Sequence, residues 1–403
     1  MITPEEAWAI VLAHARPLER TAVPLAEALG CCLAQEVRAD RDLPPADRSA
    51  RDGYAVRQDD LSRLPCILRV IGEVAAGSSS RPRVVLGACA RILTGANLPP
   101  GADTVIMVEQ TGERDGMVTI KAAEGSGTHI LRRGEDARKG AVLLSPGTQL
   151  CATQIGVCAA VGKAEVKVHR RPRVRVLCTG SELRSVRDRV RPHEIRNSNG
   201  PALCAALAQW GFPEVRFRVV ADQQAALLAA LRAALSGGDV VLFTGGVSAG
   251  VYDYVPEAVL AAGATIRFHG LSMRPGKPTL YATAQGNRHI FGLPGNPLSV
   301  LTSFHEFALP ALYRLGGCPA GACRAAWPLP LAEATQSAGG WLWCQLARLT
   351  SGPQGLAVAP VPFASSADLV SAGRADGAIL LPPDRTRFAV GELVQFRPWR
   401  PIP

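Results

Sequence analysis

Three acidic residues follow three apolar runs in the middle of the chain. Glu182, Asp222 and Asp253 each stand in a loop after a segment with the pattern of a buried strand. Because the carboxyl ends of parallel strands meet at one edge of a sheet, we expect these carboxylates to converge. Mg²⁺ is commonly held by one or two carboxylates together with substrate phosphate and water. The pattern predicts a metal site, while a helix N-cap explains Asp222 equally well, and solvated loop acids are the alternative for the other two.

The third of these loops is rich in glycine. In the segment FTGGVSAGVYDY, Gly245, Gly246 and Gly250 would let backbone N–H groups approach an anion at the start of a helix. A tight turn also needs glycine, and the chain contains neither the P-loop pattern nor the dinucleotide-binding pattern. We therefore expect either a plain turn or a phosphate site of another kind. The residues expected around such an anion are Thr179, Gly245, Gly246 and Ser248.

Two cations flank a rigid turn further along the chain. Arg274 and Lys277 stand in the segment MRPGKPT, where a Pro-Gly pair fixes the directions of both side chains. Cations opposite carboxylates suit a phosphate or oxyanion beside a metal, whereas a basic surface turn is the alternative for this motif alone. The segment FGLPGNPLSV then begins a helix whose first N–H groups also favour an anion. The residues expected there are Pro294, Pro297 and Ser299.

A second group of polar residues lies in the first third of the chain. The segments PPADRSARDGYAV, ILTGANLPPGAD and LRRGEDARKG carry Asp52, Thr94, Arg133 and Asp136 within an otherwise apolar region. Taken alone, RRGED is typical of a solvated charge run. The seven histidines show no Ser-His-Asp pattern, so we expect them to be structural.

The elements that must position these residues change character along the chain. The amino terminus predicts a helix capped by Thr3, with Pro4 and Glu6 in favoured first-turn positions, and LAEALGCCLAQEV predicts a second helix. Residues 64–142 consist of short apolar runs between Gly, Pro, Asn and Asp, which indicates a β-rich region. The segment TQIGVCAAVG then predicts a further helix.

The second half of the chain predicts an α/β region followed by a β region. Strand and helix patterns alternate over 173–316, which indicates βαβ units and a mostly parallel sheet covered on both faces. Asp222 would cap one of its helices, LYATA and RHIFGL predict a hairpin-like pair, and a long helix is expected from Asn296. Residues 318–330 predict a linker, and the short strands after them a small β-barrel or sandwich.

Composition limits the class of protein. A chain of 403 residues exceeds one ordinary hydrophobic core, so we expect two to four domains. The net charge of +10 suits phosphorylated molecules and oxyanions, and the basic run HRRPRVRV lacks the aromatic residues of a nucleic-acid module, so no nucleic acid is expected. The eleven cysteines form no CxxC pair; Cys318 and Cys323 come nearest, and buried reduced thiols are expected. Without a signal-peptide pattern or an apolar run of about 18 residues, a soluble cytoplasmic protein is expected.

Seven motifs occur in an order typical of one enzyme family: SARDGYAV, ILTGA, RRGED, TGSEL, GGVSAGVYDY, RPGKP and GLPGNPLS. Through them the whole chain resembles the molybdopterin molybdenumtransferase family, known as MoeA in bacteria and as the E domain of gephyrin in animals. The resemblance implies a multidomain α/β plus β fold with a doubly wound α/β domain like that of molybdopterin adenylyltransferases. The implied domains are an elongated helical dimerisation domain at 1–43 and 138–170, a β-rich insert at 44–137, an α/β molybdopterin-binding catalytic domain at 171–317, and a carboxyl-terminal β-barrel at 318–403.

The resemblance also implies an activity. Family members insert molybdate into adenylylated molybdopterin with Mg²⁺-assisted release of AMP, which is the last step of molybdenum cofactor biosynthesis. They are homodimers whose active site lies between the α/β domain of one subunit and the insert of the other. Transient partners would be a molybdopterin adenylyltransferase and the molybdoenzymes or chaperones that accept the cofactor. There are two kinds of alternative. One is another enzyme with the same α/β domain, such as an adenylyltransferase or a nucleotide pyrophosphatase, and the other is a scaffold that binds a partner protein.

Individual site residues carry over by motif. Glu182, Asp222 and Asp253 resemble the family's acidic residues around Mg²⁺ and the phosphates. The residues that resemble the molybdate-holding positions are Arg274, Lys277, Pro278, Ser299 and Ser366. The residues that resemble those completing the site across the dimer are Asp52, Thr94 and Asp136. The chain departs from the family at Arg51, where Met is common, at Arg274, which is often Lys, and at Gly270 and Leu131, where some members carry further basic residues.

Overall fold

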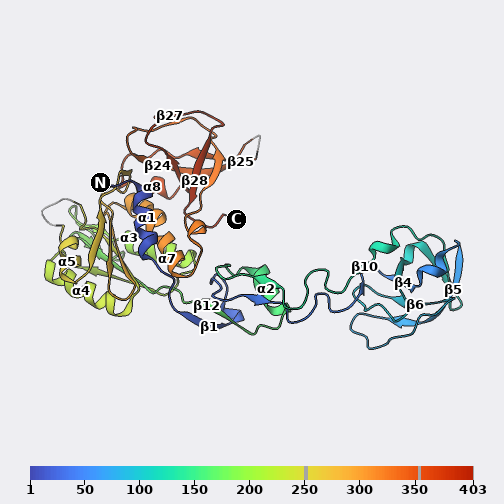
Figure 1. The fold of residues 1–403 in the computed structure, drawn as a ribbon. Helices are drawn as coiled ribbons and strands as arrows, with labels where there is room; N and C mark the ends of the chain where they lie inside the picture. Colours follow the sequence, from blue (N-terminus) through green and yellow to red (C-terminus); the bar gives the residue numbers. More distant parts are fainter. Residues whose placement is uncertain (249–252, 353–354, 403) are drawn as a thin grey trace. The chain divides into compact units, whose positions relative to one another are not determined.

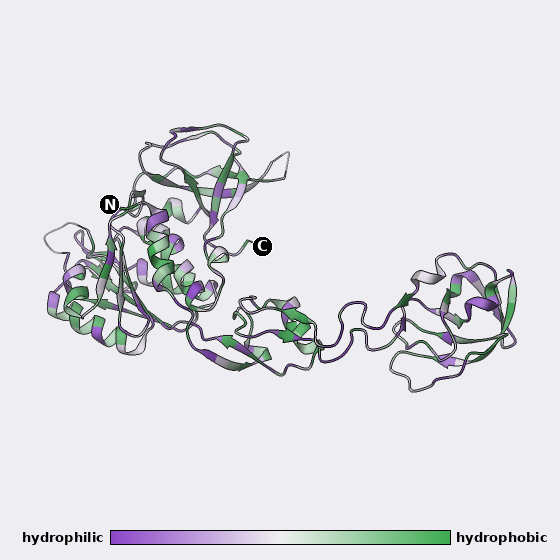
Figure 2. Cartoon of the chain, viewed as in Figure 1, coloured by the Kyte–Doolittle hydropathy of each residue, from purple (hydrophilic) through white to green (hydrophobic). Residues whose placement is uncertain are grey.

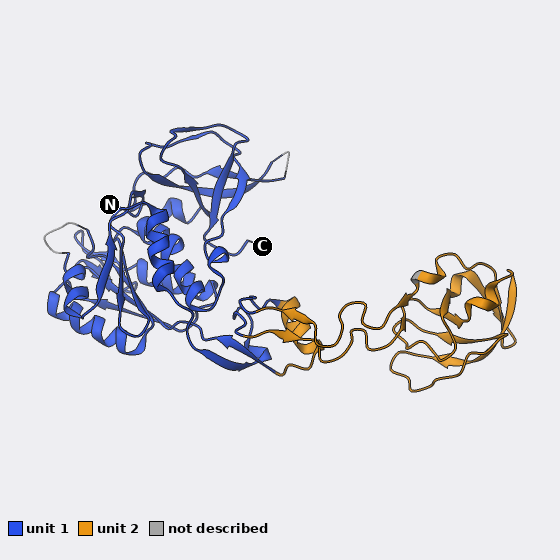
Figure 3. Ribbon diagram, viewed as in Figure 1, with its two compact units in different colours: residues 1–34, 146–151, 165–403 blue, residues 35–145, 152–164 orange. Residues whose placement is uncertain are grey.

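The computed structural model describes residues 1–248, 253–352 and 355–402. The chain divides into two compact units, coloured blue and orange in Figure 3. Unit 1 comprises Met1–Ala34, Pro146–Cys151 and Glu165–Pro403, and unit 2 comprises Gln35–Ser145 and Ala152–Ala164. The four-domain boundaries given above remain a prediction.

Unit 2 is built on a sheet of short strands, as the punctuated apolar runs predict. The strand order is β7-β4-β6-β5-β9-β8. The strands are β4 (Gly53–Val56), β5 (Cys66–Val74), β6 (Ala88–Ile92), β7 (Thr104–Met107), β8 (Thr111–Arg114) and β9 (Met117–Ile120). Tyr54 and Ile106 pack in one apolar cluster, while Ala55 and Val105 pack in another. Because neighbouring residues of a strand point to opposite faces, the sheet is buried on both faces.

The turn into β4 requires a glycine. A Cβ atom on Gly53 would lie 1.8 Å from the carbonyl oxygen of Ile106 on β7, so no side chain fits next to Asp52. The other elements of unit 2 are β2 (Val37–Arg38), β3 (Arg48–Ser49), η2 (Gln58–Leu61), η3 (Val108–Gln110), η4 (Ser126–Thr128), β10 (Ile130–Leu131), β11 (Val142–Leu144) and α2 (Ala152–Ala160). The helix α2 confirms the helix predicted from TQIGVCAAVG.

Unit 1 contains the predicted α/β sheet, in the order β16-β13-β17-β21-β20-β18. Its strands are β13 (Val174–Thr179), β16 (Val215–Val220), β17 (Val240–Thr244), β18 (Thr265–His269), β20 (Leu280–Ala284) and β21 (Arg288–Leu293). The first four strands in this order are parallel, and β20 and β18 form an antiparallel edge. The alternation of strand and helix patterns therefore predicted the sheet correctly, including the pair LYATA and RHIFGL.

Helices cover both faces of this sheet (Figure 1). Leu227 of α4 (Gln224–Gly237) and Val259 of α5 (Val255–Ala261) pack with Phe243 on one face. The other face holds α1 (Pro4–His14), α3 (Asn199–Gln209) and α7 (Leu309–Leu315), whose apolar residues share a second cluster. A helix predicted from Asn296 is present as α6 (Pro297–Ser303), a π-helical turn (Phe304–Ala308) and α7. Figure 2 shows that the covering helices carry both hydrophobic and hydrophilic residues, as amphipathic helices do.

The carboxyl-terminal part of unit 1 forms a second sheet, in the order β19-β24-β26-β28-β22 with β25 beside β24. Its elements are β19 (Met273–Arg274), β22 (Trp327–Pro330), β24 (Leu342–Gly352), β25 (Gly355–Pro360), α8 (Leu369–Ala372), β26 (Gly377–Leu381) and β28 (Leu393–Pro398), with a separate pair β23 (Thr335–Gln336) and β27 (Arg387–Phe388). The strand β19 comes from the α/β region and pairs in parallel with β24, so it joins the two sheets. The predicted linker 318–330 is therefore only partly a linker, because it ends in β22 after a short η6 turn (Ala320–Ala322).

The amino-terminal region confirms one predicted helix and contradicts another. Thr3 caps α1 with a complete capping box to Glu6, as its sequence predicts. The segment LAEALGCCLAQEV is not a helix, because only a 3₁₀ turn η1 (Leu25–Glu27) forms before Gly30 adopts a φ of 77°. The buried run after Gly30 instead pairs its backbone with other segments: Leu33 N–H donates to Thr148 O at 2.9 Å and Ala34 N–H to Lys167 O at 2.9 Å.

Two further strands and a short parallel pair complete unit 1. The strand β1 (Arg20–Pro24) pairs antiparallel with β12 (Glu165–His169). The strands β14 (Leu183–Arg184) and β15 (Ile195–Arg196) pair in parallel beyond the end of β13. Across the part of the chain that the structure describes, we find no helix with the length and apolar character of a membrane span.

Candidate active site

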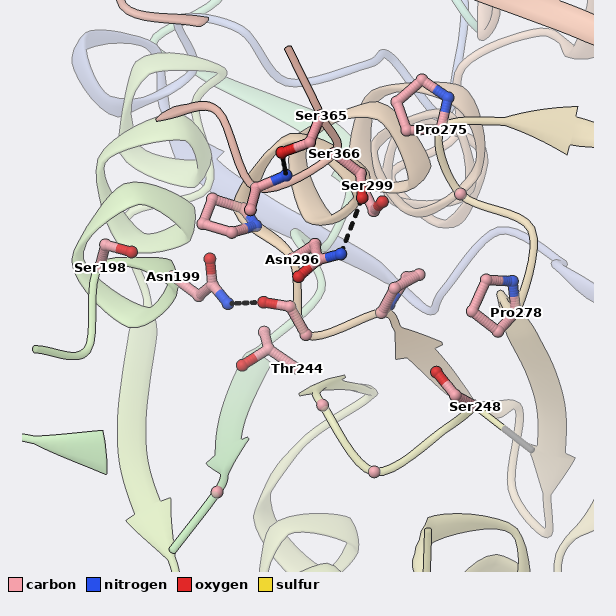
Figure 4. Close-up of a pocket in the computed structure, with 18 of the residues that line it drawn as sticks. Ser198, Asn199, Thr244, Ser248, Pro275, Pro278, Asn296, Ser299, Ser365 and Ser366 are labelled. Carbon is pink, nitrogen blue, oxygen red and sulfur yellow. Dashed lines mark hydrogen bonds between the residues drawn. The ribbon is translucent and has the colours of Figure 1, made fainter. Parts of the chain in front are cut away.

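A cavity of about 930 Å³ opens at the carboxyl ends of β13, β17 and β21, where sequence reasoning places it. Figure 4 shows residues from several loops and from the start of α6 around this space. The predicted residues that line it are Thr179, Glu182, Asp222, Gly245, Gly246, Ser248, Asp253, Arg274, Lys277, Pro278, Pro294, Pro297, Ser299 and Ser366. The fold thus brings together segments that span almost 190 residues of sequence, from 179 to 366.

Three carboxylates that line the cavity, those of Asp222, Glu182 and Asp253, are called its acidic wall. The Thr179 hydroxyl donates to Asp222 Oδ1 at 2.7 Å, so the end of β13 orients the carboxylate that follows β16. The prediction that Asp222 caps a helix is wrong, because α4 begins at Gln224 and its N-cap is Gln223, which makes no side-chain capping bond. With the helix starting beyond it, the Asp222 carboxylate is directed to Thr179 and the cavity instead.

The two other acidic residues occupy loops of the same wall. The Glu182 carboxylate folds back over the chain, where its Oε1 would lie 2.7 Å from a Cβ atom placed on Gly180. Asp253 is half-buried and follows residues 249–252, so Gly250 of the predicted anion loop lies outside the described residues. Among the described residues, no group of three His, Cys, Asp or Glu side chains is arranged to hold a metal ion. A cation here would therefore need ligands from the substrate as well, which is how Mg²⁺ is usually bound.

The glycine turn after β17 fits closely against its neighbours. Gly245 and Gly246 have φ values of 90° and 67°, which strain any residue with a side chain. A Cβ atom on Gly245 would lie 2.6 Å from the carbonyl oxygen of Thr179, and one on Gly246 would lie 2.9 Å from Val255 Cγ2. The turn needs both glycines for its own conformation, as the plain alternative requires, and its backbone also lines the cavity.

Two cations that line the same cavity, Arg274 and Lys277, are called its basic wall and are held by the second sheet. Arg274 ends β19 and lies opposite Trp343 in the parallel pairing with β24. Arg274 Cζ lies 4.7 Å from the ring centre of Trp341, and Lys277 Nζ lies 5.4 Å from the same centre. In the described part of the chain, neither cation forms an ion pair. Both therefore keep N–H donors for a bound anion, while the indole face holds their position.

The turn between these cations is fixed from beneath. Thr279 is fully buried, and its hydroxyl lies 2.7 Å from both the Gly276 carbonyl oxygen and Ser303 Oγ. Gly276 has a φ of 114°, and a Cβ atom there would meet Met273 Cε at 2.5 Å. The directions of Arg274 and Lys277 are thus set by a buried hydrogen-bond network rather than by the Pro-Gly pair alone.

Two asparagines organise the start of α6. Asn296 Nδ2 donates to Ser366 Oγ at 2.7 Å (Figure 4). Leu298 N–H donates to the Ser366 carbonyl oxygen at 3.0 Å. Asn199 Nδ2 donates to Gly295 O at 2.8 Å from the start of α3. The sequence places Asn296 at the start of this helix, as the motif GLPGNPLS indicates. Asn199 and Trp341 were not predicted, because no local pattern points to them.

The remaining predicted site residues lie in unit 2, where they are held in two places. Asp52 Oδ1 accepts from both Thr94 N–H and the Thr94 hydroxyl at 2.7 Å, and these bonds, the backbone one foremost, lower the pKa of Asp52. Arg133 Nε donates to Asp42 Oδ2 at 2.7 Å. Asp136 is exposed, and its N–H donates to Leu43 O at 2.9 Å. All four stand in the loops that the sequence indicates.

The departures from the family pattern are plain in local structure. Gly270 has a φ of 95°, a conformation that a lysine would adopt only with strain. The backbone conformation therefore explains why this position carries glycine and not a cation. Arg51 and Leu131 are both exposed in unit 2. The described histidines stay out of the cavity lining, as expected.

Comparison with known proteins agrees with this geometry. Residues 2–162 match the MoeA N-terminal region (domain I and II), residues 175–314 match a probable molybdopterin binding domain, and residues 328–399 match the MoeA C-terminal region (domain IV). A molybdopterin molybdenumtransferase of Staphylococcus epidermidis is 35% identical over 380 residues, 92% of this chain and 89% of that protein. One from Nostoc is 38% identical over 305 residues, 74% of this chain and 70% of that protein.

Solved structures show the same fold. A crystal structure of the molybdopterin biosynthesis MoeA protein from Pyrococcus horikoshii matches with a TM-score of 0.84 and 28% identity, covering 98% of this chain and 99% of that chain. A second crystal structure, also of a molybdopterin biosynthesis MoeA protein from Pyrococcus horikoshii, matches with a TM-score of 0.78 and 30% identity, covering 100% of both chains. The chain therefore belongs to the molybdopterin molybdenumtransferase family, with the multidomain α/β plus β fold that its motifs imply.

Proposed function

We propose that this protein is a molybdopterin molybdenumtransferase that inserts molybdate into adenylylated molybdopterin and releases AMP. The observation that carries the proposal is the cavity of about 930 Å³, which is lined by three carboxylates and by two cations that form no ion pair among the described residues. Its size lies within the usual range for sites that hold a molecule of nucleotide size. The names of the relatives supply the substrate, and the reaction would be the last step of molybdenum cofactor biosynthesis.

The acidic wall would hold the pyrophosphate end of the substrate. Asp222, Asp253 and Glu182 are the candidates for binding Mg²⁺. Because no three acidic side chains among the described residues are arranged around one point, one or two of these carboxylates would bind the ion, and substrate phosphate and water would complete the ligand set. When bound, Mg²⁺ would withdraw charge from the phosphate oxygens as the phosphoanhydride breaks. Thr179 keeps Asp222 in a fixed orientation, so this wall needs little rearrangement when substrate arrives.

The basic wall would hold molybdate. Arg274 and Lys277 would donate to its oxygens and place it beside the dithiolene sulfurs, and both cations keep donors available because Trp341 contacts them only through its ring. The residues that would close this part of the site are Pro278, Ser299 and Ser366. Cleavage of the phosphoanhydride is then coupled to insertion of the metal, because both substrates share one cavity.

The active enzyme is proposed to be a homodimer in the cytoplasm. Asp52, Thr94, Arg133 and Asp136 of one subunit would complete the site formed by the α/β region of the other. A molybdopterin adenylyltransferase would supply the adenylylated substrate, and molybdoenzymes or their chaperones would receive the finished cofactor. The short bonds from Thr94 to Asp52 give that carboxylate a fixed position, as a residue that acts on a ligand requires.

The test measures AMP release by purified protein with adenylylated molybdopterin, Mg²⁺ and molybdate, together with activation of a cofactor-free molybdoenzyme. Asp253→Asn should lower AMP release by about 100-fold or more, because it removes a charge beside the pyrophosphate. Glu257→Gln is the matched control, since Glu257 stands on α5 outside the cavity lining and accepts from Gln224 Nε2 at 3.1 Å. It should keep full activity.

Two results would count against the proposal. Full activity of Asp253→Asn would remove Asp253 from the site. AMP release that does not depend on molybdate would indicate a nucleotide pyrophosphatase instead.

A further inference from the structure

Three cysteines that are far apart in the sequence meet in unit 1, away from the active-site cavity. Cys32, Cys318 and Cys323 form one buried cluster, with Trp8 and Tyr313 packed against it. Their exposed fractions are 4%, 8% and 5%. Cys32 comes from the irregular run after Gly30, while the other two flank the η6 turn. The cluster therefore joins the amino-terminal region to the segment that leads into the second sheet.

The contacts within the cluster favour negative charge on one sulfur. The neighbouring thiols of Cys32 and Cys323 lower the pKa of Cys318 well below its ordinary value, and the positive charge of Arg314 adds to this effect. The same contacts, together with burial, raise the pKa of Cys32 and Cys323. Cys318 is thus the member of the cluster that most favours the thiolate, the form that attacks electrophiles.

A second cavity gives small molecules a way to this sulfur. It has a volume of about 300 Å³ and is lined by Cys318, Cys323, Tyr313 and the carboxyl-terminal residues around Arg397 and Ile402. The space accommodates water or a small peroxide, whereas the low exposure of the sulfurs disfavours bulky reagents. The described residues hold no group of three ligands arranged for a metal ion, so the cluster is not a metal site in this arrangement.

We propose that Cys318 is a peroxide-reactive thiol that forms a disulfide with Cys32. The Cys318 thiolate attacks one oxygen of hydrogen peroxide, the O–O bond breaks, and the products are a sulfenic acid and hydroxide, which takes a proton to become water. The Cys32 sulfur then attacks the sulfenic sulfur, an S–S bond forms, and the sulfenic oxygen leaves as a second water. The two sulfurs give up two electrons in total, and the peroxide accepts them.

Cys32 rather than Cys323 is the resolving thiol. Cys323 Sγ donates to the carbonyl oxygens of Cys318 and Pro319, at 3.5 and 3.2 Å, so its hydrogen is shared with the backbone. Among the described residues, no backbone carbonyl accepts from the Cys32 thiol, which packs against Cys318 in the cluster. A Cys32–Cys318 disulfide would link two segments that are 286 residues apart in the chain.

The neighbouring residue Cys31 provides a matched control. It is equally buried, with 7% of its surface exposed, but its side chain hydrogen-bonds to Arg171 instead of Cys318. Cys31→Ser and Cys32→Ser therefore make the same chemical change at adjacent buried positions, and only the second removes the proposed resolving thiol.

The experiment treats reduced full-length protein with hydrogen peroxide at neutral pH, then alkylates remaining thiols and maps disulfides by mass spectrometry. We expect a peptide pair joined through Cys32 and Cys318, and loss of the Cys318 thiol about tenfold faster than loss of the exposed Cys151 thiol. Cys318→Ser and Cys32→Ser should abolish the pair, while Cys31→Ser and Cys323→Ser should retain it. Circular dichroism of each variant checks that it folds.

Two outcomes would overturn the proposal. One is a Cys318 thiol that reacts no faster than Cys151 in folded protein. The other is a disulfide between Cys318 and Cys323 in the unaltered chain, which would reject Cys32 as the resolving thiol.

Discussion

Arginine side chains have different partners in the cavity of unit 1 and in the polar loops of unit 2. In unit 2, Arg133 donates to Asp42 and Arg132 Nη1 donates to Asp47 Oδ2 at 2.9 Å, so each guanidinium has a carboxylate partner. In the cavity, Arg274 lies over the ring of Trp341 and has no carboxylate partner among the described residues. An aromatic face holds a cation without using its N–H donors, whereas an ion pair occupies them.

This difference separates two tasks of charged side chains. The ion pairs of unit 2 shape its loops, since Arg133 N–H also donates to Asp47 Oδ1 at 2.8 Å and ties two loops together. The cations of the cavity remain uncompensated, which makes that wall attractive to an oxyanion. The three predictions that follow test each side of this comparison.

The largest expected effect concerns the proposed contribution of unit 2 to a partner's cavity. Asp52→Asn and Asp253→Asn should each lack activity, because one removes a carboxylate of the insert and the other a carboxylate of the cavity. Subunits of the two variants mixed in one population should regain about a quarter of normal AMP release, because half of the dimers are mixed and each mixed dimer has one intact site.

Mixing Asp222→Asn with Asp253→Asn is the control for this experiment. Both residues line the same cavity, so every site in the mixture lacks one carboxylate and no activity should return. If the Asp52→Asn mixture also stays inactive, the residues of unit 2 do not complete a site in a partner subunit.

The next effect separates the two units by pH. Burial lowers the pKa of His289 to about 4, and Tyr281 Oη lies 2.9 Å from its Nδ1, a contact suited to the neutral ring. The unfolded chain takes up a proton on His289 near pH 6.5 that the folded chain resists, so this residue should lower the stability of unit 1 by about 2 kcal/mol between pH 7 and pH 5. His305, whose pKa burial also lowers to about 4, should add a similar loss. The carboxylates of unit 2 respond to pH in a different range. The hydrogen bond from the Arg133 N–H is the main cause of the lowered pKa of Asp47, so this carboxylate keeps its contribution to the stability of unit 2 until the pH falls below about 4.

Tryptophan fluorescence can follow unit 1 alone, because all six tryptophans lie in its segments. Urea unfolding at pH 7 and pH 5 should show this loss of stability in the unaltered chain and a smaller loss of stability in His289→Gln. Hydrogen exchange over unit 2 should reveal no matching change in stability. An equal pH dependence in His289→Gln would mean that another group is responsible.

Sequence patterns predicted the parts of this molecule that depend on local order along the chain. The strands of the α/β sheet, the three loops at its edge and the hairpin-like pair follow from apolar periodicity and glycine-rich turns. Asp is a favoured N-cap residue, so the sequence predicts that Asp222 caps a helix. The structure shows instead that α4 begins at Gln224 and that its N-cap is Gln223. The helix expected from LAEALGCCLAQEV failed because its consecutive buried residues pair with distant backbone segments.

Contacts between distant segments could not be predicted in the same way. Trp341 reaches Arg274 because β19 pairs with β24, and no pattern within either segment announces that pairing. The cysteine cluster is a similar case, since Cys32 and Cys318 are brought together by the packing of the amino-terminal region against α7 and η6. The motifs that carried the family resemblance identify residues of the site, but they do not contain the residues that hold those side chains in place.

The smallest of the three effects tests the aromatic support directly. Trp341→Leu should raise the KM for molybdate about 3- to 10-fold, because it removes a cation–π contact from both Arg274 and Lys277 and lets them lose their common orientation. The KM for adenylylated molybdopterin should change little, since its pyrophosphate is assigned to the carboxylates and not to these cations. Trp341→Phe keeps a ring under the cations, so its KM for molybdate should fall between those of Trp341→Leu and the unaltered protein. Trp327→Leu removes a tryptophan that contacts neither cation and should leave the KM for molybdate unchanged. Equal increases in both KM values would show that Trp341 supports the fold of this wall in general and not the molybdate-binding cations in particular.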